Sequence, residues 1–409
     1  MNTSEKILIL SYLLLVFFTV GCEDLAEKRK FENPNDPKAE KANASKTSSQ
    51  NDPTTNTTTT GNPGAPNGQE NTSQNEEDFE VKGSFNFSHV ISVTPEGCSE
   101  VKKIKFFDNN SDLMVFVQTK CSTRQHVYAV TMTYSGETTS TPKLITSDCN
   151  TGSGIIGFDV DKGSSNYLMS YACQDDDATF KIIPISLDGI PGISKEVSTM
   201  GRIAWNDEAK AFGFAGYPLG LQRFDEHGET IGGPIEARTA SLSQFSVFDG
   251  EWLVYSESQG YSMTINQSGA IKCKDGPIAN YRAVFLSKDL FLEFSIGVQG
   301  IYTYSFDGTT CKDVKRRGDV VYASFGSVFN GIMLDETMAV ALYETNSSTN
   351  KSLTVTTIDI SSGSLYADSS VAGFSTLNFA EVRAIDNKIY VGYDKNGEGF
   401  ISYSEESIR

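Results

Sequence analysis

The sequence predicts an all-β protein, a seven-bladed β-propeller of four-stranded antiparallel blades closed by an N-terminal strand on the last blade. Two observations support this. Beyond residue 80 the composition shifts to Val, Ile, Phe, Tyr and Gly, and a unit of about 40 to 50 residues recurs. The ends of this region also complement each other, because the last repeat lacks an outer strand and the first is preceded by a spare one.

Each repeat begins with a strand that ends in an apolar residue followed by Asp or Asn. These pairs are Phe107-Asp108, Phe158-Asp159, Trp205-Asn206, Phe248-Asp249, Leu334-Asp335 and Ile385-Asp386, with a looser version at residues 286–289 in the fifth place. Asp and Asn side chains accept hydrogen bonds from nearby backbone amides, so we interpret the recurring residue as a turn former.

A strongly apolar strand follows each pair, and an alternating strand comes next. The apolar strands are Leu113–Val117, Tyr167–Ala172, Ala211–Ala215, Trp252–Tyr255, Leu290–Phe294, Met338–Tyr343 and Ile389–Tyr393. The alternating strand ends at a turn glycine, which supplies the positive φ of a tight hairpin. These glycines are Gly136, Gly189, Gly228, Gly269, Gly308 and Gly363. Four such strands form one blade, and repeated blades of this length are typical of propellers.

The two ends of the repeat region predict how the ring closes. The seventh repeat stops at Ser404–Glu406, where its turn glycine would fall, and residues 85–94 form a strand pattern without a partner. Pairing this strand with the last blade would join the first and last repeats and remove two exposed edges. We therefore predict that residues 85–94 lie beside residues 389–405.

The N-terminal segment predicts export. Ile7–Val20 is an apolar run, shorter than the ~20 residues that a membrane-spanning helix needs, so residues 1–21 are predicted to be a signal peptide. The run ends in TVGC at 19–22, which resembles the bacterial lipobox. The resemblance implies that Cys22 receives diacylglycerol and anchors the mature protein to a membrane. An ordinary cleaved signal peptide is the alternative.

Residues 22–80 are predicted to be the lipidated cysteine and a disordered tether, and residues 81–409 the propeller. The tether consists mainly of Asn, Thr, Ser, Pro, Glu and Lys, too polar to form a core. Its root-mean-square span would be roughly 40 Å. The repeat region resembles tandem repeats of bacterial propeller lipoproteins of unassigned activity. This resemblance implies a lipid-anchored protein of the bacterial cell envelope, expected at the outer membrane on its periplasmic or its surface face.

The remaining cysteines predict disulfides, because an even number in an exported chain usually forms bridges. Cys98 and Cys121 occupy places equivalent to Cys149 and Cys173 in the next repeat, which predicts two equivalent bridges. Cys273 and Cys311 are left as a possible third pair, although equivalent positions on adjacent blades can lie too far apart for a bridge. Metal binding by cysteines is disfavoured because no C-x-x-C pair occurs.

Charge limits the partners. The formal net charge is −18, and an acidic chain repels phosphate backbones, so we predict no nucleic acid partner. The basic cluster of Lys312, Lys315, Arg316 and Arg317 is too small to reverse this and is interpreted as a solvated loop.

One local pattern resembles a calcium-binding EF-hand loop. Asp394, Asn396, Glu398 and Glu405 supply oxygen ligands at spacings close to those of such a loop. The preceding segment reads as a strand, and no exit helix fits after Glu405, so a polar hairpin turn is the favoured interpretation. Accordingly, no metal and no cofactor are predicted, and no catalytic residues are assigned.

Two functional hypotheses remain. The favoured one is a non-catalytic binding or scaffold domain that presents a propeller face to a protein or a glycan, and so more a binding protein than an enzyme. The alternative is a carbohydrate-active enzyme with carboxylates at the central channel. Two carboxylates about 5 to 10 Å apart at the channel mouth would favour the enzyme.

Overall fold

The computed structural model describes residues 84–408 apart from several short segments. These segments are 150–151, 175–177, 218–219, 237–241, 257–260, 275–281, 288–289, 296–299, 308–311, 322–324, 347–350, 361–364 and 407, and the strand side chains of 261–263, 272–274, 282–283, 293–295, 300–307, 312–321, 325–328, 346 and 365–367 are likewise outside the description. The chain divides into two compact units, Met1–Glu76 and Glu77–Arg409, and all described residues belong to the second. No helix in this described part is long and apolar enough to cross a membrane.

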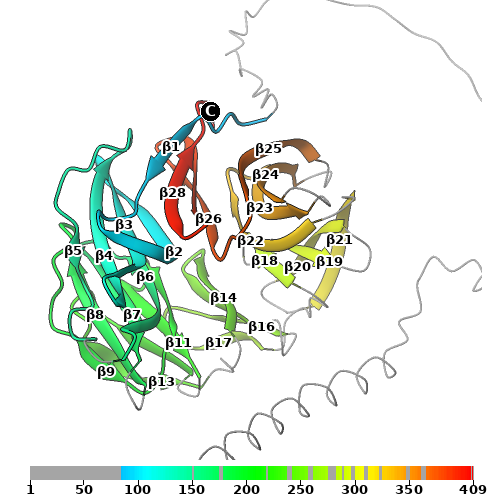
Figure 1. Cartoon of the computed structure of the whole chain (residues 1–409). Coiled ribbons are helices and arrows are strands. Elements are labelled where there is room, and N and C mark those ends of the chain that lie inside the picture. Colours follow the sequence, from blue (N-terminus) through cyan, green and yellow to red (C-terminus); the bar gives the residue numbers. More distant parts are fainter. Residues whose placement is uncertain are drawn as a thin grey trace, which may run out of the picture. The chain divides into compact units, whose positions relative to one another are not determined.

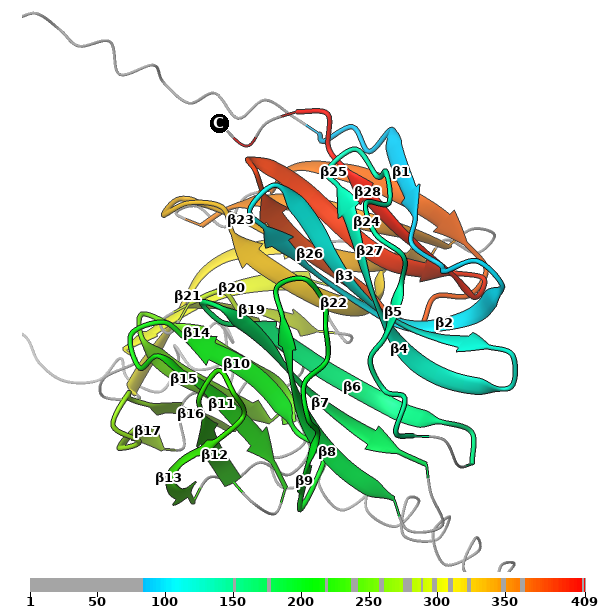
Figure 2. The same cartoon turned by 90° about the vertical axis from the view of Figure 1, so that its left-hand side faces the viewer.

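The described residues form seven four-stranded sheets, each a blade, arranged around a common centre (Figures 1 and 2). Blade one is β2 (Cys98–Asn109), β3 (Asp112–Cys121), β4 (Arg124–Thr133) and β5 (Lys143–Leu144); blade two is β6 (Ile155–Lys162), β7 (Asn166–Cys173), β8 (Thr179–Ser186) and β9 (Lys195–Val197). Blade three is β10 (Arg202–Asn206), β11 (Ala211–Gly216), β12 (Gly220–Phe224) and β13 (Thr230–Ile235); blade four is β14 (Leu242–Phe248), β15 (Glu251–Ser256), β16 (Tyr261–Ile265) and β17 (Ile271–Lys274). Blade five is β18 (Arg282–Phe285), β19 (Leu290–Ser295), β20 (Gly300–Asp307) and β21 (Lys312–Val321); blade six is β22 (Phe325–Met333), β23 (Met338–Asn346), β24 (Lys351–Asp359) and β25 (Leu365–Phe374). Blade seven combines β26 (Ala380–Ile385), β27 (Lys388–Lys395) and β28 (Glu398–Tyr403) with β1 (His89–Ser92). The predicted four-stranded antiparallel blades are thus confirmed.

The hydrophobic core is divided among the interfaces between blades. Each cluster of buried apolar side chains in the described residues joins two consecutive blades. Leu253 of blade four packs with Phe285 of blade five, for example, and Leu113 of blade one packs with Ile401 of blade seven. One cluster lies between the last blade and the first. Burial of apolar side chains therefore stabilises the closed ring, and a blade on its own would lack this stabilisation.

Ring closure follows the prediction. β1 pairs antiparallel with β28 in a register that sets His89 opposite Tyr403 and Ser92 opposite Phe400. The Val93 amide continues the ladder by donating to the Gly399 carbonyl at 2.9 Å. In Figure 1, β1 at the start of the described chain lies beside β28 near its end.

The apolar strands and turn glycines are also confirmed where they are described. In the blades whose side chains are described, the second strand is strongly buried, as the pattern of β3 shows from Leu113 to Thr119. Gly136, Gly189, Gly228 and Gly269 all have positive φ. Gly308 and Gly363 lie outside the described residues.

The interpretation of the repeated Asp or Asn as a turn former holds for some blades and is wrong for Asp159. Asn206 accepts a hydrogen bond from the Ala209 amide, and Asp335 accepts one from the Met338 amide, as turn residues do. Asp159 instead lies within β6, and the turn of its blade comes later, after Lys162. Strand β6 continues past Phe158, so in blade two the Phe158-Asp159 pair lies before the turn and not at it.

Two disulfides are present as predicted, Cys98–Cys121 and Cys149–Cys173. Cys273 lies in β17, where only its backbone is described, and Cys311 lies outside the described residues, so the third pairing stays a prediction.

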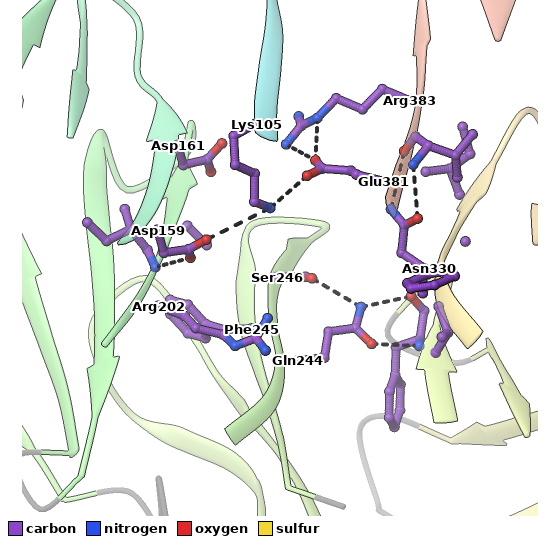
Figure 3. A pocket seen from close by; sticks show the side chains of 18 of the residues that line it. Lys105, Asp159, Asp161, Arg202, Gln244, Phe245, Ser246, Asn330, Glu381 and Arg383 are labelled. Atoms are coloured by element: carbon purple, nitrogen blue, oxygen red, sulfur yellow. Dashed lines mark hydrogen bonds and ion pairs between the residues drawn. The ribbon is translucent and has the colours of Figure 1, made fainter. Parts of the chain in front are cut away.

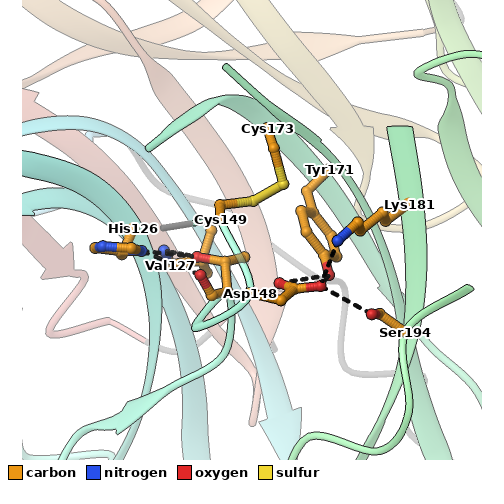
Figure 4. The surroundings of a disulfide bond; sticks show 9 residues. His126, Val127, Asp148, Cys149, Tyr171, Cys173, Lys181 and Ser194 are labelled. Atoms are coloured by element: carbon orange, nitrogen blue, oxygen red, sulfur yellow. Dashed lines mark hydrogen bonds and ion pairs between the residues drawn. A yellow bond between two sulfur atoms is a disulfide. The ribbon is translucent and has the colours of Figure 1, made fainter. Parts of the chain in front are cut away.

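The Cys149–Cys173 bridge is supported by a polar cluster (Figure 4). The Asp148 carboxylate accepts hydrogen bonds from Tyr171 at 2.9 Å, Lys181 at 2.8 Å and Ser194 at 2.8 Å. These contacts fasten the segment between blades one and two onto blade two. Asp148 also lies near both sulfur atoms, but the sulfurs are joined to each other, so this group offers no thiolate to a metal.

Replacing Cys149 and Cys173 together with Ala is expected to lower the free energy of unfolding by about 3 kcal/mol, because the unfolded chain then loses a closed loop. Urea unfolding of the variant and the wild type under non-reducing conditions measures the difference. Equal midpoints for the two proteins would contradict the bridge.

A candidate ligand site in the central channel

The inner strands of all seven blades line one cavity of about 870 Å³. Its wall includes residues of β2, β6, β10, β14, β18, β22 and β26, so the cavity follows the axis of the ring. A second cavity of about 500 Å³ shares Asp161 and Arg383 with the first and lies toward the ends of β2, β6 and β26. The channel therefore extends from the beginnings of the inner strands toward their turns.

A row of alternating charges crosses one wall of the channel, shown in Figure 3. The Lys105 ammonium of blade one lies 3.0 Å from Glu381 of blade seven and 3.8 Å from Asp159 of blade two. Arg383 donates to Glu381 on its other side, at 2.6 Å. Because Glu381 comes from the last blade and Lys105 from the first, this row exists only when the ring is closed.

Both carboxylates in the row are ionised. Burial alone would raise their pKa values, but neighbouring cations outweigh it. Lys103 and Lys105 hold the pKa of Asp159 below its ordinary value, and Arg383 and Lys105 do the same for Glu381. Burial lowers the pKa of Lys103. The row is thus a compensated ion network rather than an acid poised to donate a proton.

Asp161 is a third carboxylate in the channel, and its environment differs. Burial raises its pKa, while Arg383 and the backbone amide of Trp205 oppose that effect. That amide donates to the Asp161 carboxylate at 2.7 Å, from β10 of blade three to β6 of blade two. Asp161 forms no direct ion pair with the described residues. Of the three channel carboxylates, it is therefore the one best suited to hold and donate a proton.

Other polar side chains in the channel fasten neighbouring inner strands together. Each one accepts from a backbone amide of the next blade, and the two carboxamides also donate to the carbonyl of the same residue. The pairs are Asp159 with Ile203 at 3.0 Å, Gln244 with Phe285 at 2.8 and 3.0 Å, and Asn330 with Val382 at 2.9 and 3.2 Å. The hydrogen bonds of these side chains join the inner strands of neighbouring blades, which do not pair through their backbones. The polar atoms that make these bonds are therefore not free to bind a ligand.

Two cations on the wall are not engaged in this way. Arg202, the first residue of β10, and Lys102 of β2 are exposed and make no hydrogen bond or ion pair with the described residues. Arg202 and Phe245 both line the cavity and are labelled in Figure 3. The channel therefore combines a satisfied charge network with cations that remain available.

The structure does not bring the calcium-loop residues together. Asp394 is buried and accepts from the amides of Asn378 and Phe379, both at 2.7 Å. Asn396 accepts from Ser375 at 2.6 Å in the turn between β27 and β28, whereas Glu398 is exposed. Glu405 follows the far end of β28, where it contacts Ser88 and Asn86. Asp394 and Glu405 thus lie at opposite ends of the same hairpin.

Sequence reasoning missed the channel residues Lys105, Glu381 and Arg383. Each is a charged residue at an alternate position of an inner strand, between apolar residues, as in AEVRAI of β26. That alternation was the available signal. The alternation could not show that blades seven, one and two would place opposite charges at the same height along the channel axis. Cys22 lies outside the described residues.

Acid is expected to destabilise the propeller through these carboxylates. The pKa values of Asp148, Asp159 and Glu381 are lowered in the folded state, so their stabilisation is complete above the ordinary carboxyl pKa near 4. It is lost as the pH falls below that value through the lower folded-state pKa. The urea concentration at the midpoint of unfolding should stay constant between about pH 5 and 7 and fall steeply below about pH 4. The Asp148→Asn variant should show a shallower fall, and an unchanged slope would contradict the role of Asp148.

Comparisons with known proteins show the fold and no family. No protein-family model matches the chain, and no curated protein matches it. Among solved structures, a chain in the crystal structure of the mitotic checkpoint complex is 11% identical, with a TM-score of 0.50, covering 84% of this chain and 96% of that one. KlHsv2 with loop 6CD replaced by a Gly-Ser linker is 8% identical, with a TM-score of 0.44, covering 72% and 89%. At 11% identity the first likeness extends to the fold alone, and the protein is a β-propeller.

Proposed function

We propose that this protein is a lipoprotein of the bacterial envelope, anchored through Cys22, whose propeller is a non-catalytic binding or scaffold domain. The TVGC sequence at 19–22 and the polar stretch that follows support the anchor, with the outer membrane as the expected location and no nucleic acid as a partner. The ligand is a protein or a glycan bound at a propeller face. A rigid ring with a polar axial cavity suits such a role.

One observation carries the binding role. Glu381 and Asp159 share the Lys105 ammonium, and cations hold the pKa values of both below the ordinary range. Carboxylates in this state are ionised at neutral pH and donate no proton to a leaving group. The network supports a fixed, charged surface that recognises a ligand.

The anchor is tested by metabolic labelling with an alkyne fatty acid. The wild-type chain should take up the label and sediment with membranes, and Cys22→Ser should do neither. Thr19→Leu serves as the matched control, since an aliphatic residue is usual at this lipobox position and labelling should persist. Labelling of the C22S chain, or its absence from the wild type, would contradict the anchor. Photo-crosslinking in intact cells, followed by identification of captured envelope components, tests the binding role.

A hydrolase is the second candidate, and a specific observation favours it. Because Glu381 and Asp159 contact the same ammonium at 3.0 and 3.8 Å, their oxygens lie less than about 7 Å apart, which is compatible with the closely spaced carboxylates of retaining glycosidases. Asp161, whose pKa is raised, could then act as the acid. Incubation with a panel of envelope glycans decides between the two. Turnover that Glu381→Gln or Asp161→Asn abolishes would replace the binding proposal with this one.

A further inference from the structure

The charge of the channel is opposite to that of the chain. The sequence contains 52 acidic and 34 basic residues, giving a net charge of −18. The cavity wall nevertheless carries more basic than acidic side chains, namely Lys102, Lys103, Lys105, Arg202 and Arg383 against Asp159, Asp161 and Glu381. A local excess of positive charge inside a strongly acidic molecule focuses anions on this cavity.

The excess charge lies at one end of the channel. Arg202 begins β10, and Lys102 and Lys103 lie in the first half of β2, so all three belong to the mouth formed by the beginnings of the inner strands. Glu381 is paired with Lys105 and Arg383, whereas Asp159 lies at this mouth, where it pairs with Lys103 at 3.4 Å and accepts from the amide of Ile203, the residue after Arg202. Arg202 and Lys102 are therefore the cations of this mouth that form no ion pair with a described residue.

Lys102 lies in an irregular part of β2. The pairing of β2 with β3 is interrupted between Ser99 and Lys103, and Glu100 within this bulge has a φ of 53°. The Cys98–Cys121 bridge joins the two strands directly before the bulge. A bulge re-aims the side chains it carries, and here the covalent bridge limits its freedom.

Arg202 supplies the directional part of the site. Its side chain is exposed and forms no ion pair with a described carboxylate, although its charge helps to lower the pKa of Asp159. A guanidinium presents paired N–H donors that match the two oxygens of a carboxylate or phosphate. Phe245, which lines the same cavity, offers an apolar surface to the body of the same ligand.

We propose that the channel mouth bounded by Arg202 and Lys102 binds an oxyanion, a carboxylate or a phosphate or sulfate ester, carried by a small ligand. Arg202 pairs with two oxygens of this group, and Lys102 supplies charge from blade one, on the other side of blade two. The proposal rests on the channel acting as a binding site, and it names the chemistry that the site recognises.

Isothermal titration of the full-length protein with three probes, inorganic phosphate, inorganic sulfate and glucuronate, tests this site, with glucose as the neutral control. We expect saturable heat with at least one anion and none with glucose, and weaker binding at high salt. Arg202→Gln should weaken binding at least tenfold, and Arg202→Lys should retain part of it. Lys210→Gln, which removes an exposed cation of the same blade outside the cavity, should bind as the wild type does.

The outcomes separate the ligand sources and the two proposals. Binding of glucuronate alone assigns the site to carboxylated sugars, and binding of phosphate or sulfate alone assigns it to esters. No heat with any anion, or equal binding by R202Q and the wild type with both proteins folded by circular dichroism, would overturn the site. Neither result would alter fatty-acid labelling at Cys22 or the glycan turnover assay, so failure here is distinguishable from failure of the proposed function.

Discussion

A chain that begins at Thr94 and so lacks β1 is expected to be largely unfolded at 37 °C. The truncation removes the ladder between β1 and β28 and four buried apolar side chains, Phe85, Phe87, Ile91 and Val93. Burial of one such side chain stabilises by about 1.5 to 3 kcal/mol, so the loss is of the order of the whole stability of a typical domain. Circular dichroism against temperature and the soluble yield measure the effect.

The matched control is a chain that begins at Ser84, which keeps every described residue of the propeller. It should melt at the same temperature as the full-length protein. A chain without β1 that melts within a few degrees of this control would show that the N-terminal strand does not close the ring. The truncation also exposes the edge of β28, so aggregation is expected with the loss of structure.

The second large effect is expected from Lys105→Met. This change removes the ammonium shared by the buried carboxylates of Glu381 and Asp159, and leaves Glu381 with Arg383 and Asp159 with Lys103 as their remaining cations. Removing one partner of a buried ion pair typically costs about 3 to 5 kcal/mol. Urea unfolding at pH 7 should show a loss of that size, and the double variant Lys105→Met with Glu381→Gln should recover part of it.

A surface pair provides the comparison for Lys105→Met. Lys195 contacts Glu229, whose side chain is 70% exposed, so Lys195→Met should cost less than about 1 kcal/mol. The pH dependence gives a second test. Without Lys105, the pKa of each carboxylate should rise because one of the cations that lower it is gone, so the deficit of the variant should shrink as the pH falls. A loss below 1 kcal/mol, or a deficit that grows in acid, would contradict the network.

The repeat was predictable because blade chemistry is local. Apolar strands such as Trp252–Tyr255 and turn glycines such as Gly228 carry their structure within a few residues, and the fold follows from counting them. The closure was predictable for a related reason. A strand without a partner at one end and a blade one strand short at the other are both visible in the sequence, and pairing them buries both edges.

The channel was not predictable, because its residues become neighbours only through closure. Glu381 and Lys105 are far apart in sequence. Nothing in the sequence of either strand indicates how far along the channel axis its charged side chain lies. Asp159 was misread as a turn residue because the Phe-Asp pair in β6 imitates the pairs at true turns. The position of a residue within its blade follows from the local sequence pattern. Which residues of different blades face each other across the channel follows only from the pairing of all the strands in the closed ring.

Oxidation of a designed cysteine pair tests ring closure most directly. Ser92 of β1 lies opposite Phe400 of β28, so Ser92→Cys with Phe400→Cys places two sulfurs on the same face of adjacent strands. We expect this pair to form a disulfide, detected by mass spectrometry of the linked peptides. Ser92→Cys with Ile401→Cys, shifted by one residue, should stay reduced because the side chains point to opposite faces. Absence of the first bridge, or equal formation of both, would show that the ring does not close in this register.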